Sequence, residues 1–192
     1  DTMMNESRFN HRIFAIDYSG STDKVEFYHK TVKQIFDRYY KEGDTIILWT
    51  DYYKIIDKKQ MDEITAKREG TSGTEPIYIA KALLDKKDIP REHLILVTDG
   101  NIGPTDIENT TKFVNDNNIV FKYASIFIID EYVTDWDKCG KLSVGISFCR
   151  NNPCEKRGFS KSGEKIDSIQ NDNDIKILEN IDEINDVEDF RK

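Results

Sequence analysis

The chain has 192 residues and a net charge of −8, with 38% hydrophobic and 11% aromatic residues. It can therefore bury the core of one domain. The acidic balance excludes proteins that bind nucleic acid or an anionic membrane through a broad positive field. No apolar run approaches the roughly 20 residues of a transmembrane helix, so we expect no membrane insertion. The charge is uneven, because residues 164–192 alone carry a net charge of −6.

The cysteines and the N-terminus favour a cytoplasmic protein. Cys139, Cys149 and Cys154 are odd in number and form no cluster with zinc spacing, so we interpret them as free thiols. No signal-peptide pattern is present at the N-terminus. We therefore expect a cytoplasmic location.

Apolar runs alternate with helical patterns along the first two thirds of the chain. The run "RIFAI" at 12–16 predicts a strand buried on both faces. In residues 23–41 apolar side chains recur at spacings of three and four, which is typical of one face of a helix. The further expected elements are strands at 45–49 and 53–56, a weak helix at 59–68, a helix from Pro76 to about Leu84, a strand within 93–100, a helix opened by a capping box at Thr105–Glu108, and strands at 119–129 and 142–148.

The last fifth of the chain differs in composition from the rest. Residues 150–172 are polar and predict a linker. From Ile175 to Phe190 an apolar residue recurs every three positions, which predicts a terminal helix that packs at its start. We therefore divide the chain into one domain over 1–150 and a polar, acidic linker with a terminal helix over 151–192.

The alternation of strands and helices predicts an α/β fold. We expect a Rossmann-like, doubly wound, mostly parallel six-stranded sheet with helices on both faces and one antiparallel edge strand at 53–56. Such folds place their site beyond the carboxyl ends of the strands, where the strand order reverses. The first and fourth strands lead into Asp17 and Asp99. If these strands are neighbours, both carboxylates lie at that crevice.

The stretch "DYSGS" at 17–21 has the chemistry of a metal site. Asp17, Ser19 and Ser21 occupy every second position, so they point to the same side of an extended loop. A carboxylate with two hydroxyls is an oxygen-only set that suits Mg²⁺ or Mn²⁺ rather than zinc. We expect a hydroxyl from "SGTEP" and the carboxylate of Asp99 to complete it. Two carboxylates balance the divalent charge, and the neutral hydroxyls leave the ion able to accept one more acidic oxygen.

Together these motifs resemble those of the von Willebrand factor type A (vWA) domain. "DYSGS" matches the D-x-S-x-S signature of that family, Gly73-Thr74 matches its metal-site threonine with Thr71 as the alternative, and "LVTDG" at 96–100 matches its distal aspartate. The resemblance spans residues 11–149 and implies a vWA fold with an intact metal-ion-dependent adhesion site (MIDAS). It implies that Ser19, Ser21 and Thr74 bind the metal, and that Asp17 and Asp99 contact it directly or through water.

The resemblance also implies a function, which is protein–protein interaction without catalysis. The ion would be Mg²⁺, with Mn²⁺ or Ca²⁺ as substitutes, and it would accept a glutamate or aspartate from a partner protein. "IILWTD" and "SVGISFCRN" resemble intracellular members of the family. The chain also lacks the cysteine pair that flanks the domain in adhesion members.

Other interpretations of the same residues stay open. Asp17 could cap the helix that follows, although a cap needs one such residue and this loop offers three. The chain could be a vWA scaffold subunit that binds through another surface. A metal-dependent phosphotransferase would resemble D-x-D, but Ser19 stands where the second carboxylate is needed. His11, His29 and His93 have no nucleophile beside them in the sequence, so we expect no catalytic residue.

Overall fold

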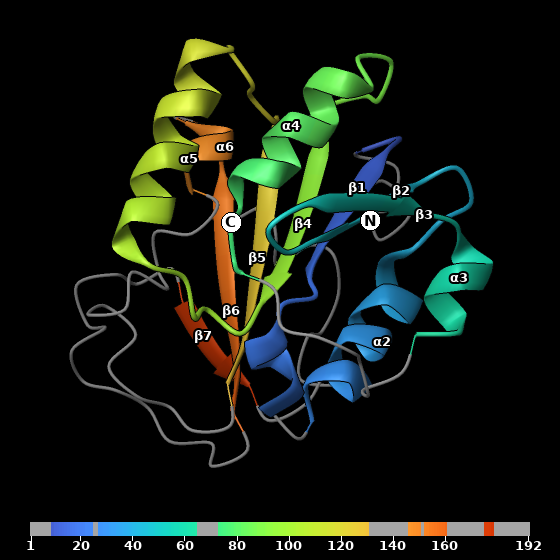
Figure 1. The fold of residues 1–192 in the computed structure, drawn as a ribbon. Helices are drawn as coiled ribbons and strands as arrows, with labels where there is room; N and C mark the ends of the chain where they lie inside the picture. The colour runs from blue at the N-terminus through green and yellow to red at the C-terminus, as the bar shows by residue number, and fades with distance from the viewer. Residues whose placement is uncertain are drawn as a thin grey trace.

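The computed structural model describes residues 9–24, 27–64, 73–130, 146–150, 152–160 and 175–178. In these ranges one sheet has seven strands in the order β3-β2-β1-β4-β5-β6-β7 (Figure 1). The strands are β1 (Arg12–Asp17), β2 (Thr45–Trp49), β3 (Tyr53–Ile56), β4 (His93–Thr98), β5 (Tyr123–Asp130), β6 (Cys154–Ser160) and β7 (Ile175–Leu178). Only β3, at one edge, pairs antiparallel with its neighbour. The prediction of a mostly parallel sheet with one antiparallel edge strand is therefore confirmed, with one strand more than expected.

Helices cover both faces of this sheet (Figure 1). They are the 3₁₀ helix η1 (Gly20–Lys24), α2 (Tyr28–Tyr39), α3 (Lys58–Asp62), α4 (Ile77–Asp85), α5 (Pro104–Asp116) and α6 (Ile146–Cys149). Successive residues of β1 point to opposite faces: Phe14 packs in the cluster with α2 and α3, and Ala15 in the cluster with α4, α5 and α6. This two-sided burial explains why β1 and β4 are continuous apolar runs. The arrangement is an α/β fold consistent with the vWA and Rossmann-like folds.

The strand order reverses between β1 and β4. The chain runs from β1 outward to β2 and β3, and then returns to place β4 on the other side of β1. β1 and β4 pair in parallel, with Ile16 opposite Val97. The first and fourth strands are therefore central neighbours, as predicted. Asp17 and Asp99 lie at the carboxyl ends of these two strands.

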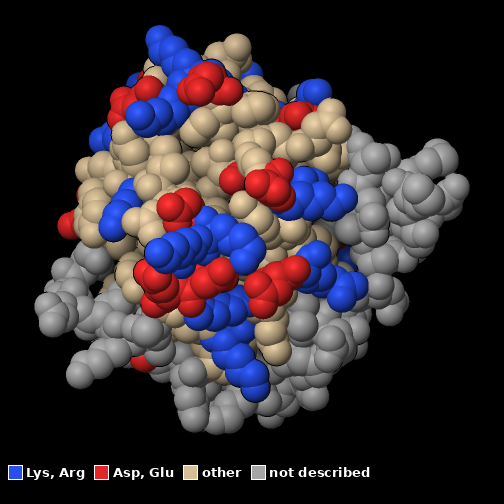
Figure 2. Space-filling model, turned by 90° about the vertical axis from the view of Figure 1, so that its right-hand side faces the viewer, with Lys and Arg blue, Asp and Glu red and all other residues tan. Residues whose placement is uncertain are grey.

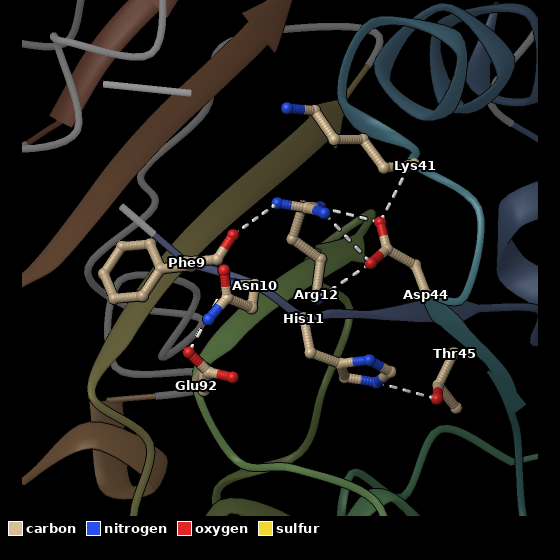
Figure 3. Close-up of polar contacts among 8 residues, drawn as sticks. All are labelled: Phe9, Asn10, His11, Arg12, Lys41, Asp44, Thr45 and Glu92. Atoms are coloured by element: carbon tan, nitrogen blue, oxygen red, sulfur yellow. Dashed lines mark hydrogen bonds and ion pairs between the residues drawn. The ribbon is translucent and has the colours of Figure 1, made fainter. Parts of the chain in front are cut away.

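The amino ends of β1 and β2 carry a structural polar cluster (Figure 3). Arg12 Nε donates to Asp44 Oδ2 at 2.7 Å, and Arg12 Nη2 donates to Asp44 Oδ1 at 3.1 Å. The carboxylate of Asp44 also accepts hydrogen bonds from the backbone N–H groups of Arg12 and Lys41. His11 Nε2 lies 2.9 Å from Thr45 Oγ1. These contacts hold the amino ends of β1 and β2 together, far along the strands from Asp17.

The structure corrects the prediction at the C-terminal side. The strand expected at 142–148 is wrong where it can be compared, because Ile146–Cys149 is helix α6; residues 142–145 lie outside the described ranges. The linker predicted over 150–172 is wrong at Cys154–Ser160, which forms β6. The terminal helix is wrong at Ile175–Leu178, which forms β7, and the rest of it lies outside the described ranges. The sheet thus continues past the boundary expected at residue 150.

The beginnings of two helices also differ from the prediction. The helix expected from residue 23 begins at Tyr28, since Asp23 belongs to η1. Helix α5 begins at Pro104, and its N-cap Gly103 forms no side-chain cap, so the expected capping box is wrong. Proline fixes its own φ near the helical value and suits this first position. No helix in the described ranges is long and apolar enough to span a membrane.

Candidate metal centre

Asp17 ends β1 and has its carboxylate fixed from two sides. Its side chain is completely buried. Oδ1 accepts a hydrogen bond from the backbone N–H of Ser19 at 2.9 Å, and Oδ2 accepts one from Thr98 Oγ1 at 2.6 Å. Its backbone carbonyl accepts a hydrogen bond from the hydroxyl of Tyr28 at 2.5 Å. Contacts from the following loop, from β4 and from α2 therefore determine where this carboxylate lies.

The two serines of the loop lie next to each other. Ser19 Oγ and Ser21 Oγ are 3.1 Å apart. Ser19 is completely buried and Ser21 is half-buried. The loop is not extended as we expected, because η1 starts at Gly20 and Thr22 donates from both its N–H and its Oγ1 to the carbonyl of Ser19. The two serine hydroxyls lie together, but a helical turn and not an extended loop brings them there.

Asp99 lies in the turn that follows β4. It is 4% exposed, and its Oδ1 accepts a hydrogen bond from the backbone N–H of Asn101 at 3.0 Å. The next residue, Gly100, has a φ of 75°, which is the left-handed region that glycine adopts at little cost. Its N–H donates to Thr98 Oγ1 at 3.0 Å. A single threonine thus fixes both the turn with Asp99 and the carboxylate of Asp17.

The electrostatics around Asp17 and Asp99 favour a bound cation. Burial and the nearby negative charge of Asp99 raise the pKa of Asp17 from its ordinary 3.8 to about 7, although hydrogen bonds from Ser19 and Thr98 act in the opposite direction. Two buried carboxylates repel each other in this way unless a positive charge lies between them. The donor set of carboxylate and hydroxyl oxygens is the one that Mg²⁺ prefers, so the residues present fit a hard divalent cation.

The third predicted hydroxyl belongs to a loop beside the end of β2. Thr74 is half-buried. The backbone N–H of the next residue, Glu75, donates to the carbonyl of Thr50 at 2.9 Å, which attaches the loop to the end of β2. Among the described contacts, no hydrogen bond joins Thr74 to Asp17, Ser19, Ser21 or Asp99, so its role as a ligand stays a prediction. Its alternative, Thr71, lies outside the described ranges.

The capping alternative for Asp17 does not hold for helix α2. The N-cap of α2 is Phe27, and no side chain caps this helix. Asp17 instead accepts from an N–H two residues ahead, as aspartate does in turns. Within the described ranges, no group of three or more His, Cys, Asp or Glu side chains is placed to hold a metal. The predicted site contains two carboxylates and relies on hydroxyls for its other ligands.

Sequence reasoning did not identify Thr98 and Tyr28, which contact Asp17 directly. Thr98 had a signal: it is a polar residue at the end of a strand whose preceding four residues are apolar. Tyr28 had none, because it lies within the regular apolar spacing of a helix. The three histidines contact neighbouring side chains: His11 Nε2 lies 2.9 Å from Thr45 Oγ1 and His93 Nε2 lies 2.8 Å from Ser125 Oγ. The rings of His29 and Tyr18 pack edge to face with their centroids 5.9 Å apart.

Comparisons with known proteins give no family assignment. No family model matches the chain, and no curated protein matches it by sequence. Among solved structures it is similar to the conserved hypothetical protein BatB from Bacteroides thetaiotaomicron, with 16% identity and a TM-score of 0.43. It is also similar to an aerotolerance-related membrane protein from Bacteroides fragilis NCTC 9343, with 13% identity and a TM-score of 0.39. Each match covers 62% of this chain and 66% of the other, just under two thirds of its length.

Proposed function

We propose that this chain is a metal-ion-dependent protein-interaction module. A divalent cation, Mg²⁺ with Mn²⁺ or Ca²⁺ as substitutes, is held by Asp17, Ser19, Ser21, Thr74 and Asp99 and accepts a carboxylate from a partner protein. The observation that carries the proposal is the pair of buried carboxylates, Asp17 and Asp99, at the carboxyl ends of adjacent central strands. That is where folds of this type bind their ligands.

In this proposal the carboxylates supply charge, and the hydroxyls supply further oxygen ligands. Asp17 and Asp99 supply two negative charges, which neutralise a divalent cation. Ser19 and Ser21 supply hydroxyl oxygens 3.1 Å apart, which add ligands without adding charge. When bound, the ion supplies an electrophilic position for one external carboxylate. Thr98 and Tyr28 bind no partner in this proposal, but they hold Asp17 in place through hydrogen bonds to its side chain and backbone.

The first test is a calorimetric titration of the protein with Mg²⁺. We expect one ion per chain for the wild type and at least a tenfold weaker affinity for Asp99→Ala. This variant should remain folded, because it removes a like charge beside Asp17 and frees only the N–H of the exposed Asn101. Asp51→Ala is the matched control, since it removes an exposed carboxylate from the loop after β2. Failure of the wild type to bind Mg²⁺ would refute the metal site.

The second test addresses the partner. The immobilised protein is incubated with a cell lysate in Mg²⁺ and in EDTA, beside Asp99→Ala and Asp51→Ala. A partner retained only in Mg²⁺, and only by chains with Asp99, supports carboxylate recognition through the ion. Equal retention in all conditions would contradict it and would favour the scaffold alternative, in which another surface of the chain binds.

A further inference from the structure

A cavity opens beside the loop that carries Ser19, on the face of the sheet that carries α3. Its volume is about 360 Å³, near the lower end of the roughly 300–1,000 Å³ range of ligand pockets. The residues that line it include Tyr18, Leu48, Tyr52, Lys54, Ile56 and Ile64. This volume suits one or two side chains of a peptide better than a large cofactor.

The cavity lies beside the loop that carries the proposed metal ligands Asp17 and Ser19. Tyr18 lines the cavity and stands between Asp17 and Ser19 in the chain, so its Cα is about 3.8 Å from the Cα of each. Its N–H donates to the carbonyl of Trp49 at 3.0 Å, which fixes the loop to the end of β2. An extended peptide advances about 3.3–3.6 Å per residue. We therefore expect a segment lying across this loop to reach both places within about three residues.

The cavity wall is chemically different from the metal site. Leu48, Ile56 and Ile64 belong to the hydrophobic cluster on this face, and Tyr18 and Tyr52 add aromatic rings. Tyr52 is 58% exposed, although large hydrophobic side chains elsewhere in the described ranges are mostly buried. Thr50 and Gln60 add polar groups to the wall. Tyrosines are frequent anchors of protein interfaces, because they combine a large apolar ring with a polar group. The cavity thus fits an apolar side chain, whereas the metal site fits an acid.

The charges around the cavity do not favour a strongly charged ligand. Lys54 and Glu63 both line it and have opposite signs. Figure 2 views the molecule from the side where α3 lies and shows Lys and Arg interleaved with Asp and Glu, without a patch of one sign. Only the metal would then supply a specific electrostatic contact, and the cavity would supply apolar burial.

We propose that the cavity receives a large apolar side chain of the same partner segment whose carboxylate binds the metal. The module then recognises an extended peptide with an aspartate or glutamate and, within about three residues of it, a leucine-like or aromatic residue. This inference rests on the proposed function, because the acid of the partner places the peptide beside Tyr18. It adds the side-chain preference that the metal alone does not provide.

The test is a selection of binders from a displayed library of random peptides on the immobilised protein in Mg²⁺. We expect the selected peptides to share one acidic and one large apolar residue at a fixed spacing. Fluorescence anisotropy with synthetic copies then measures the loss when the acid becomes its amide or the apolar residue becomes alanine. Each change should weaken binding about tenfold or more.

Two protein variants locate the apolar contact. Tyr52→Ala should weaken the peptides about tenfold but leave Mg²⁺ binding unchanged. Ile55→Ala is the matched control, because Ile55 is the other exposed hydrophobic residue of this hairpin, at 36% exposure, and does not line the cavity. It should bind the peptides like the wild type.

The outcomes separate this inference from the proposed function. Peptides that need Mg²⁺ and the acid, but show no apolar preference and no effect of Tyr52→Ala, overturn the inference and leave the proposed function intact. Apolar peptides that bind equally well in EDTA and to Asp99→Ala overturn the shared recognition, since the cavity is then a separate site. A library without any Mg²⁺-dependent binder counts against both. Sedimentation tests a further outcome. If the protein forms a Mg²⁺-dependent dimer that Tyr52→Ala abolishes, the partner is a second copy of the chain, which would contradict recognition of a peptide from another protein.

Discussion

A hydrogen bond joins Thr98 at the end of β4 to Asp17 at the end of β1. These strands are the neighbours between which the strand order of the sheet reverses. Thr98 Oγ1 donates to Asp17 Oδ2 at 2.6 Å and accepts from the N–H of Gly100 at 3.0 Å. Both side chains are completely buried. One hydroxyl therefore links the carboxylate at the end of β1 to the turn that carries Asp99 after β4.

Replacing Thr98 with valine keeps the shape of the side chain and removes this hydroxyl. We expect the free energy of unfolding to fall by about 1–3 kcal/mol, because a buried carboxylate oxygen loses its donor and a buried N–H loses its acceptor. Mg²⁺ binding should also weaken, since Asp17 is less well fixed. Urea denaturation in EDTA and a calorimetric Mg²⁺ titration measure the two effects. Thr98→Ser retains the hydroxyl and should retain most of both properties; equal behaviour of the valine and serine variants would contradict this role.

The buried pair of carboxylates predicts a pH dependence of stability in the absence of metal. Burial and Asp99 raise the pKa of Asp17 from 3.8 to about 7, so between these values the folded protein binds a proton that the unfolded chain has released. Stability from this group is thus fully present below about pH 4 and is lost as the pH rises towards 7. Mg²⁺ competes with this proton and should reduce the loss.

Asp17→Asn isolates this effect from the titration of other carboxylates. Its amide does not titrate, so the stability difference between variant and wild type in EDTA should shift in favour of the variant as the pH rises from about 4 to 7. Urea denaturation at several pH values, in EDTA and in Mg²⁺, provides the measurement. A difference that does not change with pH would mean that Asp17 is already ionised throughout this range.

The sequence was sufficient to predict that Asp17 and Asp99 follow neighbouring strands, because both strands are buried in the same way. β1 and β4 are buried on both faces, so each appears as an unbroken apolar run followed by a polar residue. Asp17 and Asp99 therefore marked the carboxyl ends of two strands, and the topology of doubly wound sheets placed them together. The hydrogen bond from Thr98 was beyond such reasoning, because it joins residues 81 positions apart and depends on the register between β1 and β4.

The prediction failed at β6 for a different physical reason. This buried strand contains Lys156 and Arg157, which are 5% and 2% exposed. Arg157 forms an ion pair with Glu155 two residues before it, on the same face of the strand. The sequence alone does not distinguish charged residues that are paired in the interior from charged residues of a solvated linker. The polar composition therefore predicted a linker where tertiary contacts stabilise a strand.

Gly100 is a position where backbone geometry limits substitution. Its φ of 75° costs other residues about 1–2 kcal/mol, so we expect Gly100→Ala to lose about that much stability. Because the strain falls beside Asp99, Mg²⁺ affinity should fall as well. Gly73→Ala is the control, since a Cβ there would only make ordinary contacts with Asp51 and Glu75, at 3.5 and 3.6 Å. Thermal unfolding of the two variants gives the comparison, and equal stability would contradict a strained position.

The last prediction concerns the polar cluster at the amino ends of β1 and β2 (Figure 3). The side chains of Arg12 and Asp44 are 9% and 1% exposed, and they pair at 2.7 Å. Asp44→Ala should cost about 3–5 kcal/mol, because it leaves a buried guanidinium without its counter-charge. Asp116→Ala is the matched control, since Asp116 pairs with Lys112 on the surface and its loss should have little effect. Mg²⁺ affinity should not change in either variant.

A double variant distinguishes the charge of Asp44 from its hydrogen bonds. Buried ion pairs can often be replaced by apolar residues without loss, so Arg12→Leu combined with Asp44→Leu would recover full stability if only charge mattered. However, the carboxylate of Asp44 also accepts the N–H groups of Arg12 at 3.1 Å and Lys41 at 2.8 Å. Those groups lose their acceptor in the double variant, so we expect it to be more stable than Asp44→Ala but still less stable than the wild type. Urea denaturation of the three proteins measures this order, and full recovery would show that the carboxylate acts through its charge alone.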